Sequence, residues 1–466
     1  MATKVLNECT FAKTGNQHQE QFYAQCLDCF PTGNEGACVT CLQICHNGHR
    51  IGQTKKGLFF CDCAGRHFCQ MIKSTFPCSM EVEGEAINMT KSPNMPNSPN
   101  MTKSSNTLAG KLFKVMEPQT LMPPGGYPRY AELPKRLFSP LSITYALSLV
   151  HLGTMAETEK QLTDLFNCKH TMDEMKQCFD MFNNASMTMA TAFIFNDWWK
   201  INPQYTEMLK EVALVSSENF ADKSGVAERV NQFISKTTNG LIKEMISAQD
   251  INPNVIAFLV NSIYFKANWL HKFPKQSTRK CNFSNFEGEV EVDMMFQCRT
   301  MPYYENESMQ LVELPYVGNE YCMGFVLLKS PKLFFQFNME SMKNVIDQLS
   351  NDDKVELFIP KFTQRRNIDL IPHLKKLGVN DLFDENKANL EGICKEAYVA
   401  KVVHEALVIV DEEGVEAAAS TVITMVNRSI MDPKSNKVFR ADHSFHYYIR
   451  HMPTNTILFL GDYNGK

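Results

Sequence analysis

The cysteines are distributed unevenly, and ten of the sixteen lie within residues 9–78. Zinc needs thiolate or imidazole ligands in tetrahedral sets, and a Cys-x-x-Cys pair lets one turn supply two of them. Two such pairs are present, and the run from Cys45 to His49 adds two histidines. Because this segment has few aliphatic residues, bound metal would supply most of its folding free energy. The pattern therefore predicts zinc binding, and a disulfide framework is the alternative.

The sequences ECTF, GACVTCLQICHNGH and GLFFCDC place these residues in an order that resembles the UBR-type zinc finger, a family that recognises protein N-termini. The resemblance implies three zinc ions with one shared cysteine, which requires eleven ligands. This sequence offers eleven: Cys9, Cys26, Cys29, Cys38, Cys41, Cys45, His46, His49, Cys61, Cys63 and Cys69. Cys78 would remain a free thiol.

The peptide pocket of that family is matched in part. Phe60 and Asp62 stand where the family places an aromatic and an acidic residue around the bound N-terminus. Gly65 and Thr32 occupy two further positions that are acidic in members that bind basic residues. A single carboxylate attracts a cation weakly. We therefore expect a reader of a peptide or protein N-terminus, without assigning Arg or Lys to that terminus.

A second unusual segment, GVEAAASTVITMVNRS (414–429), contains three consecutive alanines, which do not suit an ordinary exposed loop. With the two-residue period of a strand, one face carries no charge: Val415, Ala417, Ala419, Thr421, Ile423 and Met425. Such a strand could insert between two existing strands and point into a core. From the pattern alone, an edge strand or an exposed helical turn is the alternative.

The elements that would position these residues indicate an α+β fold. Apolar residues recur with helical spacing over 107–116, 138–166 and 226–246. Residues 255–269 form an apolar run that is typical of a buried strand. Further strands are expected in MQLVELPY, MGFVLLK, VELFIP, VVHEALVIV and TILFLGDY. Because helices mostly precede strands without regular alternation, the order favours an α+β fold over a doubly wound parallel sheet.

A linker separates these elements from the cysteine-rich segment. Residues 79–106 repeat Asn, Ser and Pro with little apolar content, and such a composition cannot support a core. The expected organisation is a tail at 1–8, the zinc finger at 9–78, a low-complexity linker at 79–106 and a large domain at 107–466. The six cysteines of the large domain are expected to be buried free thiols: Cys168, Cys178, Cys281, Cys298, Cys322 and Cys394.

Charge and hydropathy exclude several function classes. Lys and Arg total 47 and Asp and Glu total 51, a net charge of −4 that argues against a nucleic-acid binder. No apolar run is long enough to span a membrane. The first residues lack the apolar core of a secretory signal. We therefore expect an intracellular, cytoplasmic protein in which disulfides are disfavoured, with unconventional release left open.

The large domain resembles the serpin family over residues 107–466. The matching sequences are FSPLSI (138–143), VNSIYFKANW (260–269), ELPY (313–316), IPKF (359–362), KVVHEALVIVDEEGVEAAAST (401–421) and FRADHSFHYYIRHMPTNTILFLGDY (439–463). The resemblance is greatest to the intracellular ovalbumin-type branch. It implies an α+β serpin fold with three β-sheets, about nine helices and an exposed reactive-centre loop.

The resemblance also implies roles for residues at matching positions. The reactive bond is Arg428–Ser429, and Arg at that position suits the acidic pocket of a trypsin-like serine protease. A polar network under the main sheet, the shutter, comprises Ser139, Ser142, Asn261 and His404. The hinge that lets the loop insert comprises Glu412, Glu413, Gly414, Val415, Glu416, Ala417, Ala418 and Ala419. Val415 departs from the usual Thr or Ser, but it is uncharged, so insertion should survive.

Two functions are compatible with this sequence. The first is a suicide inhibitor of trypsin-like serine proteases that performs no catalysis of its own, acts as a monomer and carries a zinc module for localisation or delivery to a partner. The alternative is a non-inhibitory serpin scaffold whose zinc module acts as a binding adaptor or decoy.

Overall fold

The computed structural model describes residues 100–116, 135–184, 186–252, 255–334, 337–339, 342–414 and 436–465, together with short strands at 19–24, 37–38, 55–59, 120–121 and 129–130. The chain divides into two compact units, Met1–Met89 and Thr90–Lys466. In the first unit, β1 (Gln19–Ala24) pairs antiparallel with β2 (Ala37–Cys38) and β3 (Lys55–Phe59). The side chains of the predicted zinc ligands, of Phe60 and of Asp62 lie outside the described residues.

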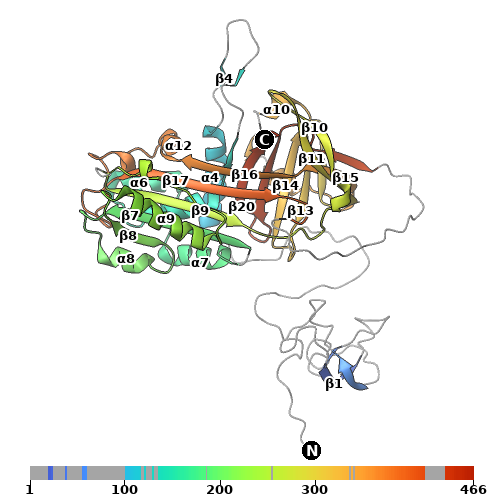
Figure 1. The fold of residues 1–466 in the computed structure, drawn as a ribbon, viewed down its shortest axis with the longest axis horizontal. Coiled ribbons are helices and arrows are strands. Elements are labelled where there is room, and N and C mark those ends of the chain that lie inside the picture. Colours follow the sequence, from blue (N-terminus) through green and yellow to red (C-terminus); the bar gives the residue numbers. More distant parts are fainter. Residues whose placement is uncertain are drawn as a thin grey trace, which may run out of the picture. The chain divides into compact units, whose positions relative to one another are not determined.

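The second unit is built around a five-stranded sheet. Its strand order is β16 (Phe362–Asp369), β17 (Val399–Val410), β9 (Ala257–Phe265), β7 (Met187–Asn196) and β8 (Leu214–Glu218). β17 and β9 are parallel direct neighbours, and Figure 1 shows them side by side. β16 and β7 flank this pair as antiparallel strands. Every residue of β9 is buried, as expected for the apolar run at 255–269.

Two further sheets and a short pair complete the strands. The six-stranded sheet has the order β12 (Tyr303–Glu305), β13 (Met309–Pro315), β14 (Tyr321–Leu328), β19 (Phe445–His451), β20 (Thr456–Tyr463) and β6 (Leu137–Phe138). The four-stranded sheet has the order β10 (Arg279–Asn285), β11 (Gly288–Thr300), β15 (Lys354–Pro360) and β18 (Lys437–Arg440). β4 (Thr120–Leu121) pairs with β5 (Arg129–Tyr130). The three larger sheets confirm the predicted α+β class.

The helices pack mainly on the five- and six-stranded sheets. They are α4 (Asn100–Val115), α5 (Pro140–His151), α6 (Ala156–Phe166), α7 (Met172–Phe182), α8 (Pro203–Leu209), α9 (Lys223–Thr237), α10 (Pro331–Phe334), α11 (Met342–Ile346) and α12 (Ile371–Lys376). α4 and α5 pack against each other and against β20, and α5 also contacts β9. α9 packs against β7. Every residue of α5 is buried, so this helix lies within the core.

Two of the predicted helices are shorter than their apolar patterns suggested. The pattern at 138–166 breaks into α5 and α6 around Gly153, where a Cβ would lie 2.1 Å from the side chain of Ile393. The pattern at 226–246 ends at Thr237 because Asn239 and Gly240 adopt positive φ angles of 52° and 77°. Left-handed residues end a helix, whatever the apolar spacing beyond them.

The start of α4 corrects the predicted linker. The helix begins at Asn100, inside the segment 79–106 that was predicted to have low complexity. Met101, Ser104 and Leu108 share one face of this helix and are buried. Contacts with the rest of the domain therefore override the weak helical preference of a Ser- and Asn-rich sequence. The linker prediction extended too far at its C-terminal end.

Candidate functional site at the seam of the main sheet

Within the five-stranded sheet, β9 and β17 form a parallel pair that we call the seam. The two strands are paired along their length. His404 in β17 lies opposite Asn261 in β9, and Asn261 lies opposite Thr191 in β7. Polar side chains from three adjacent strands therefore form one row across the seam.

The four residues predicted as a shutter lie together at this row. The Ser139 N–H donates to Nε2 of His404 at 3.0 Å, and Nδ1 of His404 lies 2.8 Å from Oδ1 of Asn261. Ser142 Oγ donates to the same Asn261 oxygen at 2.6 Å. The Ser142 N–H donates to Ser139 Oγ at 3.2 Å. All four residues are buried, so each satisfies polar groups that water cannot reach.

The hydrogen bonds fix the protonation state of His404. Because Nε2 accepts the Ser139 N–H, the ring proton lies on Nδ1 and points to Asn261. Burial lowers the pKa of His404 to about 3, so the imidazole is neutral near pH 7. Asn261 Nδ2 donates to Thr191 Oγ1 at 3.0 Å, which adds a member that the sequence analysis missed. A buried threonine in a mostly apolar strand was the available signal.

A tight turn at the end of β17 forms the described part of the predicted hinge. Oδ1 of Asp411 accepts the backbone N–H groups of Glu413 at 2.9 Å and of Gly414 at 3.0 Å. Gly414 has a φ of +123°, and a Cβ there would lie 2.5 Å from the carbonyl oxygen of Ala267. This position therefore requires glycine, and the chain direction at the hinge is set by sterics.

Backbone bonds attach this turn to the loop that follows β9. The Trp269 N–H donates to the Glu413 carbonyl, and the Phe273 N–H donates to the Glu412 carbonyl, each at 2.9 Å. The Trp269 indole N–H donates to the Asp411 carbonyl at 2.8 Å. The Trp269 ring stacks on Tyr316, with ring centroids 4.5 Å apart. The turn is therefore fastened to a rigid aromatic platform at one end of the seam.

Charged side chains hold the two hinge carboxylates, and sequence reasoning did not find them. Lys361 Nζ and Thr278 Oγ1 each lie 2.9 Å from a different carboxylate oxygen of Glu412. Partial burial acts to raise the pKa of Glu412, but these bonds outweigh it and lower the pKa. The pKa of Glu413 is lowered mainly by hydrogen bonds from two lysines, Lys272 and Lys275. The hinge is therefore held by a set of ion pairs.

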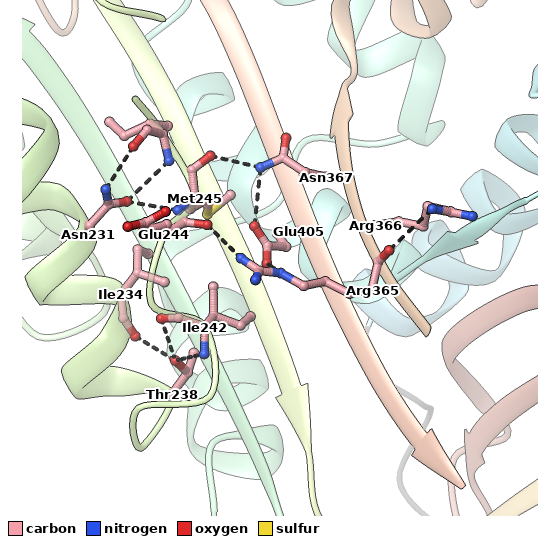
Figure 2. Close-up of polar contacts among 11 residues, drawn as sticks. Asn231, Ile234, Thr238, Ile242, Glu244, Met245, Arg365, Arg366, Asn367 and Glu405 are labelled. Atoms are coloured by element: carbon pink, nitrogen blue, oxygen red, sulfur yellow. Dashed lines mark hydrogen bonds and ion pairs between the residues drawn. The ribbon is translucent and has the colours of Figure 1, made fainter. Parts of the chain in front are cut away.

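Residues 239–247, which we call the strap, are tied to β16 by side-chain bonds. Figure 2 shows the contacts. Arg365 in β16 pairs with Glu405 in β17 and donates to the Glu244 carbonyl at 2.6 Å. Asn367 Nδ2 donates to the Met245 carbonyl at 2.8 Å and to Glu405 at 3.1 Å. The strap is therefore bonded to β16, and the same two β16 side chains contact Glu405 in β17.

The strap is also bonded to α9, and apolar side chains fill the space beneath it. Asn231 in α9 accepts the N–H groups of Met245 at 2.9 Å and of Ile246 at 3.1 Å, and its Nδ2 donates to the Ile246 carbonyl at 2.7 Å. The underlying apolar cluster joins side chains of α9, the strap, β7, β9 and β17. Opening the seam would disturb this cluster as well as the shutter.

Several predicted site residues fall outside the part of the chain that the structure describes. These are the later hinge residues Val415, Glu416, Ala417, Ala418 and Ala419, the reactive bond Arg428–Ser429 and the side chains of the zinc finger. Within the described ranges, no group of three or more His, Cys, Asp or Glu side chains is arranged to hold a metal ion. No helix in those ranges is long and apolar enough to cross a membrane.

The fold and the seam match one protein family. Residues 135–465 match the family described as Serpin (serine protease inhibitor). The chain belongs to the serpin family. The family description names serine protease inhibitors, the class to which the sequence resemblance pointed.

Relatives of this serpin come from a virus and from animals. The serpin-like protein R700 of Acanthamoeba polyphaga mimivirus is 40% identical over 344 residues, which are 71% of this chain and 84% of R700. Human neuroserpin is 30% identical over 351 residues, covering 70% of this chain and 84% of neuroserpin. Human serpin B11 is 31% identical over 369 residues, covering 70% of this chain and 91% of serpin B11.

Solved structures share the fold at lower identity. Serpin48 of the insect Tenebrio molitor superposes with a TM-score of 0.67 at 24% identity, covering 79% of this chain and 99% of that one. Uncleaved ovalbumin superposes with a TM-score of 0.64 at 21% identity, covering 78% of this chain and 99% of that one. The predicted serpin fold of the large domain is therefore confirmed.

Proposed function

We propose that this serpin is a suicide inhibitor of trypsin-like serine proteases, with Arg428–Ser429 as the reactive bond. One observation carries the proposal: β9 and β17 are parallel neighbours, and β17 ends in the Gly414 turn that leads into residues 415–429. A chain that reverses at this turn runs antiparallel to β17 and also to β9. The segment could therefore pair with both strands of the seam at once.

The protease supplies all the catalytic groups for cleavage of the Arg428–Ser429 bond. The serine hydroxyl of the protease attacks the carbonyl carbon of Arg428, Ser429 leaves as the new amino terminus, and Arg428 stays attached as an ester. Insertion of residues 415–428 would then move the protease along the seam. At about 3.3 Å per residue, 14 residues span about 46 Å. This displacement would distort the protease before water cleaves the ester.

The alternation of the loop supports insertion. The face that begins at Val415 and continues through Ala417 and Ala419 is small and uncharged, so it can enter the core without an unpaired charge. Glu416 lies on the opposite face. We propose that the four shutter residues hold the seam closed until cleavage, since their hydrogen bonds join β9, β17 and α5.

The test is incubation of the full chain with trypsin, followed by a denaturing gel. We expect a covalent band near the summed mass of the two proteins. Val415→Arg should abolish this band because it buries a charge, whereas the matched variant Glu416→Arg should keep it. Clean cleavage after Arg428 without an adduct would contradict inhibition and favour the non-inhibitory scaffold.

For residues 9–78 we propose, from the sequence pattern, a UBR-type module with three zinc ions that recognises a peptide or protein N-terminus. Metal analysis of the purified full chain should give three zinc ions per chain. Cys38→Ser should lower this number and Cys78→Ser should not. Disulfides in the protein as purified under native conditions would contradict the zinc assignment. A panel of short peptides tests recognition, and binding to none of them would leave a structural role.

We also propose that this serpin belongs to the ovalbumin-type branch. Serpin B11 is among the relatives, and uncleaved ovalbumin is among the structural matches. Neuroserpin matches at a similar identity, so the branch is supported by the local sequence similarities described above more than by overall identity.

A further inference from the structure

A cluster of reactive side chains lies where α4, α5 and the connection between α6 and α7 meet. Cys168 Sγ lies 3.4 Å from Nε2 of His170 and 3.4 Å from Oγ of Ser104. Nε2 of His170 and Oγ of Ser104 are 3.0 Å apart. On the other side of the ring, Nδ1 of His170 lies 2.8 Å from Oγ of Ser148. The cluster thus surrounds one sulfur atom with two groups that can donate a hydrogen bond.

Burial differs sharply within this cluster. His170, Ser104 and Ser148 are at most 3% exposed, whereas Cys168 is partly exposed. The His170 ring packs against Phe166, with ring centroids 5.4 Å apart. The imidazole is therefore fixed and shielded from water, while the thiol remains within reach of a small solute.

The arrangement suits removal of the thiol proton. Burial lowers the pKa of His170, against a smaller raising effect of Glu174, so the ring is neutral near pH 7. Because the same burial makes the imidazole a weak base, it takes the thiol proton only as the sulfur attacks. When Nδ1 carries the ring proton and donates to Ser148, the lone pair of Nε2 faces the sulfur. After proton transfer, the Nε2–H can donate to the thiolate. The Ser104 hydroxyl, which donates to the Phe166 carbonyl at 3.1 Å, can turn to the thiolate as a second donor. Hydrogen bonds to a thiolate favour the charged, nucleophilic form.

The other described cysteines lack this environment. Cys178 and Cys322 are fully buried, and burial raises the pKa of each thiol. Cys281 is partly exposed, like Cys168. Among the cysteines of the described ranges, Cys168 alone is hydrogen-bonded to an imidazole. Cys281 therefore offers a control of similar exposure within the same molecule. The expectation that all six would be buried is wrong for Cys168, Cys281 and Cys298, of which the first two are partly exposed and the third is exposed.

We propose that Cys168 is a peroxide-reactive thiol and a site of oxidative modification, with His170 as its base and Ser104 as a donor to the thiolate. The thiol proton moves to Nε2 of His170, and the sulfur attacks one oxygen of hydrogen peroxide. The S–O bond forms as the O–O bond breaks, and the departing hydroxide takes the proton from Nε2 to become water. Cys168 is oxidised to the sulfenic acid and the peroxide is reduced to water.

The experiment treats the full chain with hydrogen peroxide near pH 7, traps sulfenic acid with dimedone and measures each cysteine by peptide mass spectrometry. We expect Cys168 to be labelled about tenfold faster than Cys281, because only the Cys168 sulfur is in contact with an imidazole that can take its proton. In His170→Asn, the amide can keep the contact with Ser148, but nothing replaces Nε2. Labelling of Cys168 should fall to the rate of Cys281.

Equal labelling of Cys168 and Cys281 in the wild type would overturn the proposal, as would an unchanged Cys168 rate in folded His170→Asn. A thermal melt establishes whether that variant folds. If it does not, Ser104→Ala removes one donor within a helix and should slow Cys168 labelling about threefold without changing Cys281. No slowing in Ser104→Ala would then count against the proposal.

Discussion

His404 has one donor and one acceptor fixed on its two ring nitrogens, and both partners lie inside the protein. Its pKa of about 3 lies below the ordinary value of 6.5. The pKa is lowered because the folded protein stabilises the neutral imidazole relative to the charged one. Its full contribution to stability is therefore present above pH 6.5 and is lost progressively as the pH falls toward 3.

We therefore expect the free energy of unfolding to fall with decreasing pH more steeply in the wild type than in His404→Asn, by about 1.4 kcal/mol per pH unit between pH 6 and pH 4. Urea denaturation at several pH values measures both slopes. The pKa of His151 and that of His451 are also lowered by burial, each to about 4, but they contribute equally to both proteins. Parallel slopes would show that His404 does not resist protonation.

The ion pair between Glu412 and Lys361 at the hinge leads to a second prediction about single residues. The Glu412 side chain is 9% exposed and lies 2.9 Å from Lys361, which is 45% exposed. Glu412→Gln removes the charge and keeps the shape, so we expect a loss of about 1 kcal/mol after allowance for solvent screening. Glu157→Gln, which affects a solvent-exposed pair with Lys160 at 3.9 Å, should change stability by less than about 0.5 kcal/mol. Chemical denaturation of both variants checks the difference, and equal losses would contradict it.

At the scale of the elements, the strap is held largely by a few side-chain bonds. Two of the N–H groups of the strap bond to the single side-chain oxygen of Asn231. Arg365, Asn367 and Thr238 are among its further anchors. Because residues 239–247 form no helix or strand, these bonds replace the regular backbone bonds that hold the neighbouring elements.

Asn231→Ala should therefore release the strap before the rest of the domain. We expect amide exchange at Met245 and Ile246 to be at least about tenfold faster, which corresponds to about 1.4 kcal/mol of local stability. Gln232→Ala is the matched control, since Gln232 is exposed on the same helix and bonds only to Glu228 among the described residues. Hydrogen exchange followed by mass spectrometry measures both. Equal exchange in the two variants would mean that Asn231 does not hold the strap.

The elements also show which parts of the fold and of the site could be predicted from the sequence. Apolar runs located β9 and β17 correctly because a strand buried on both faces has few polar residues. The resemblance to serpins located the shutter, whose members are separated by up to 265 residues. Local patterns could not locate Lys361 or Thr278, because a long or polar surface side chain reaches its partner through tertiary geometry alone. The start of α4 at Asn100 was missed for the same reason, since its buried face depends on distant partners.

Across the whole molecule, the seam is held closed at three places. The hinge turn is fastened at one end, the shutter bonds join the two strands near their middle, and the strap is bonded to β16 and to α9. In the proposed mechanism, the shutter bonds between β9 and β17 must be broken before a sixth strand can enter. The proposed trap therefore requires that the inserted strand recover more free energy than these bonds contribute, through new ladder hydrogen bonds and buried apolar surface.

This requirement leads to a prediction about cleavage in the absence of a bound protease. After a cut between Arg428 and Ser429, residues 415–428 are free to enter the seam, so the cut protein should melt about 10 °C or more above the intact protein. Differential scanning calorimetry of the intact and cut proteins tests this, with the cut site identified by mass spectrometry. Ala417→Arg should remove the increase because it places a charge on the face that enters the core. Glu416→Arg should keep the increase, since residue 416 lies on the opposite face. A cut wild-type protein that melts no higher than the intact one would show that the seam does not take up the loop, and the inhibitory mechanism would fail with it.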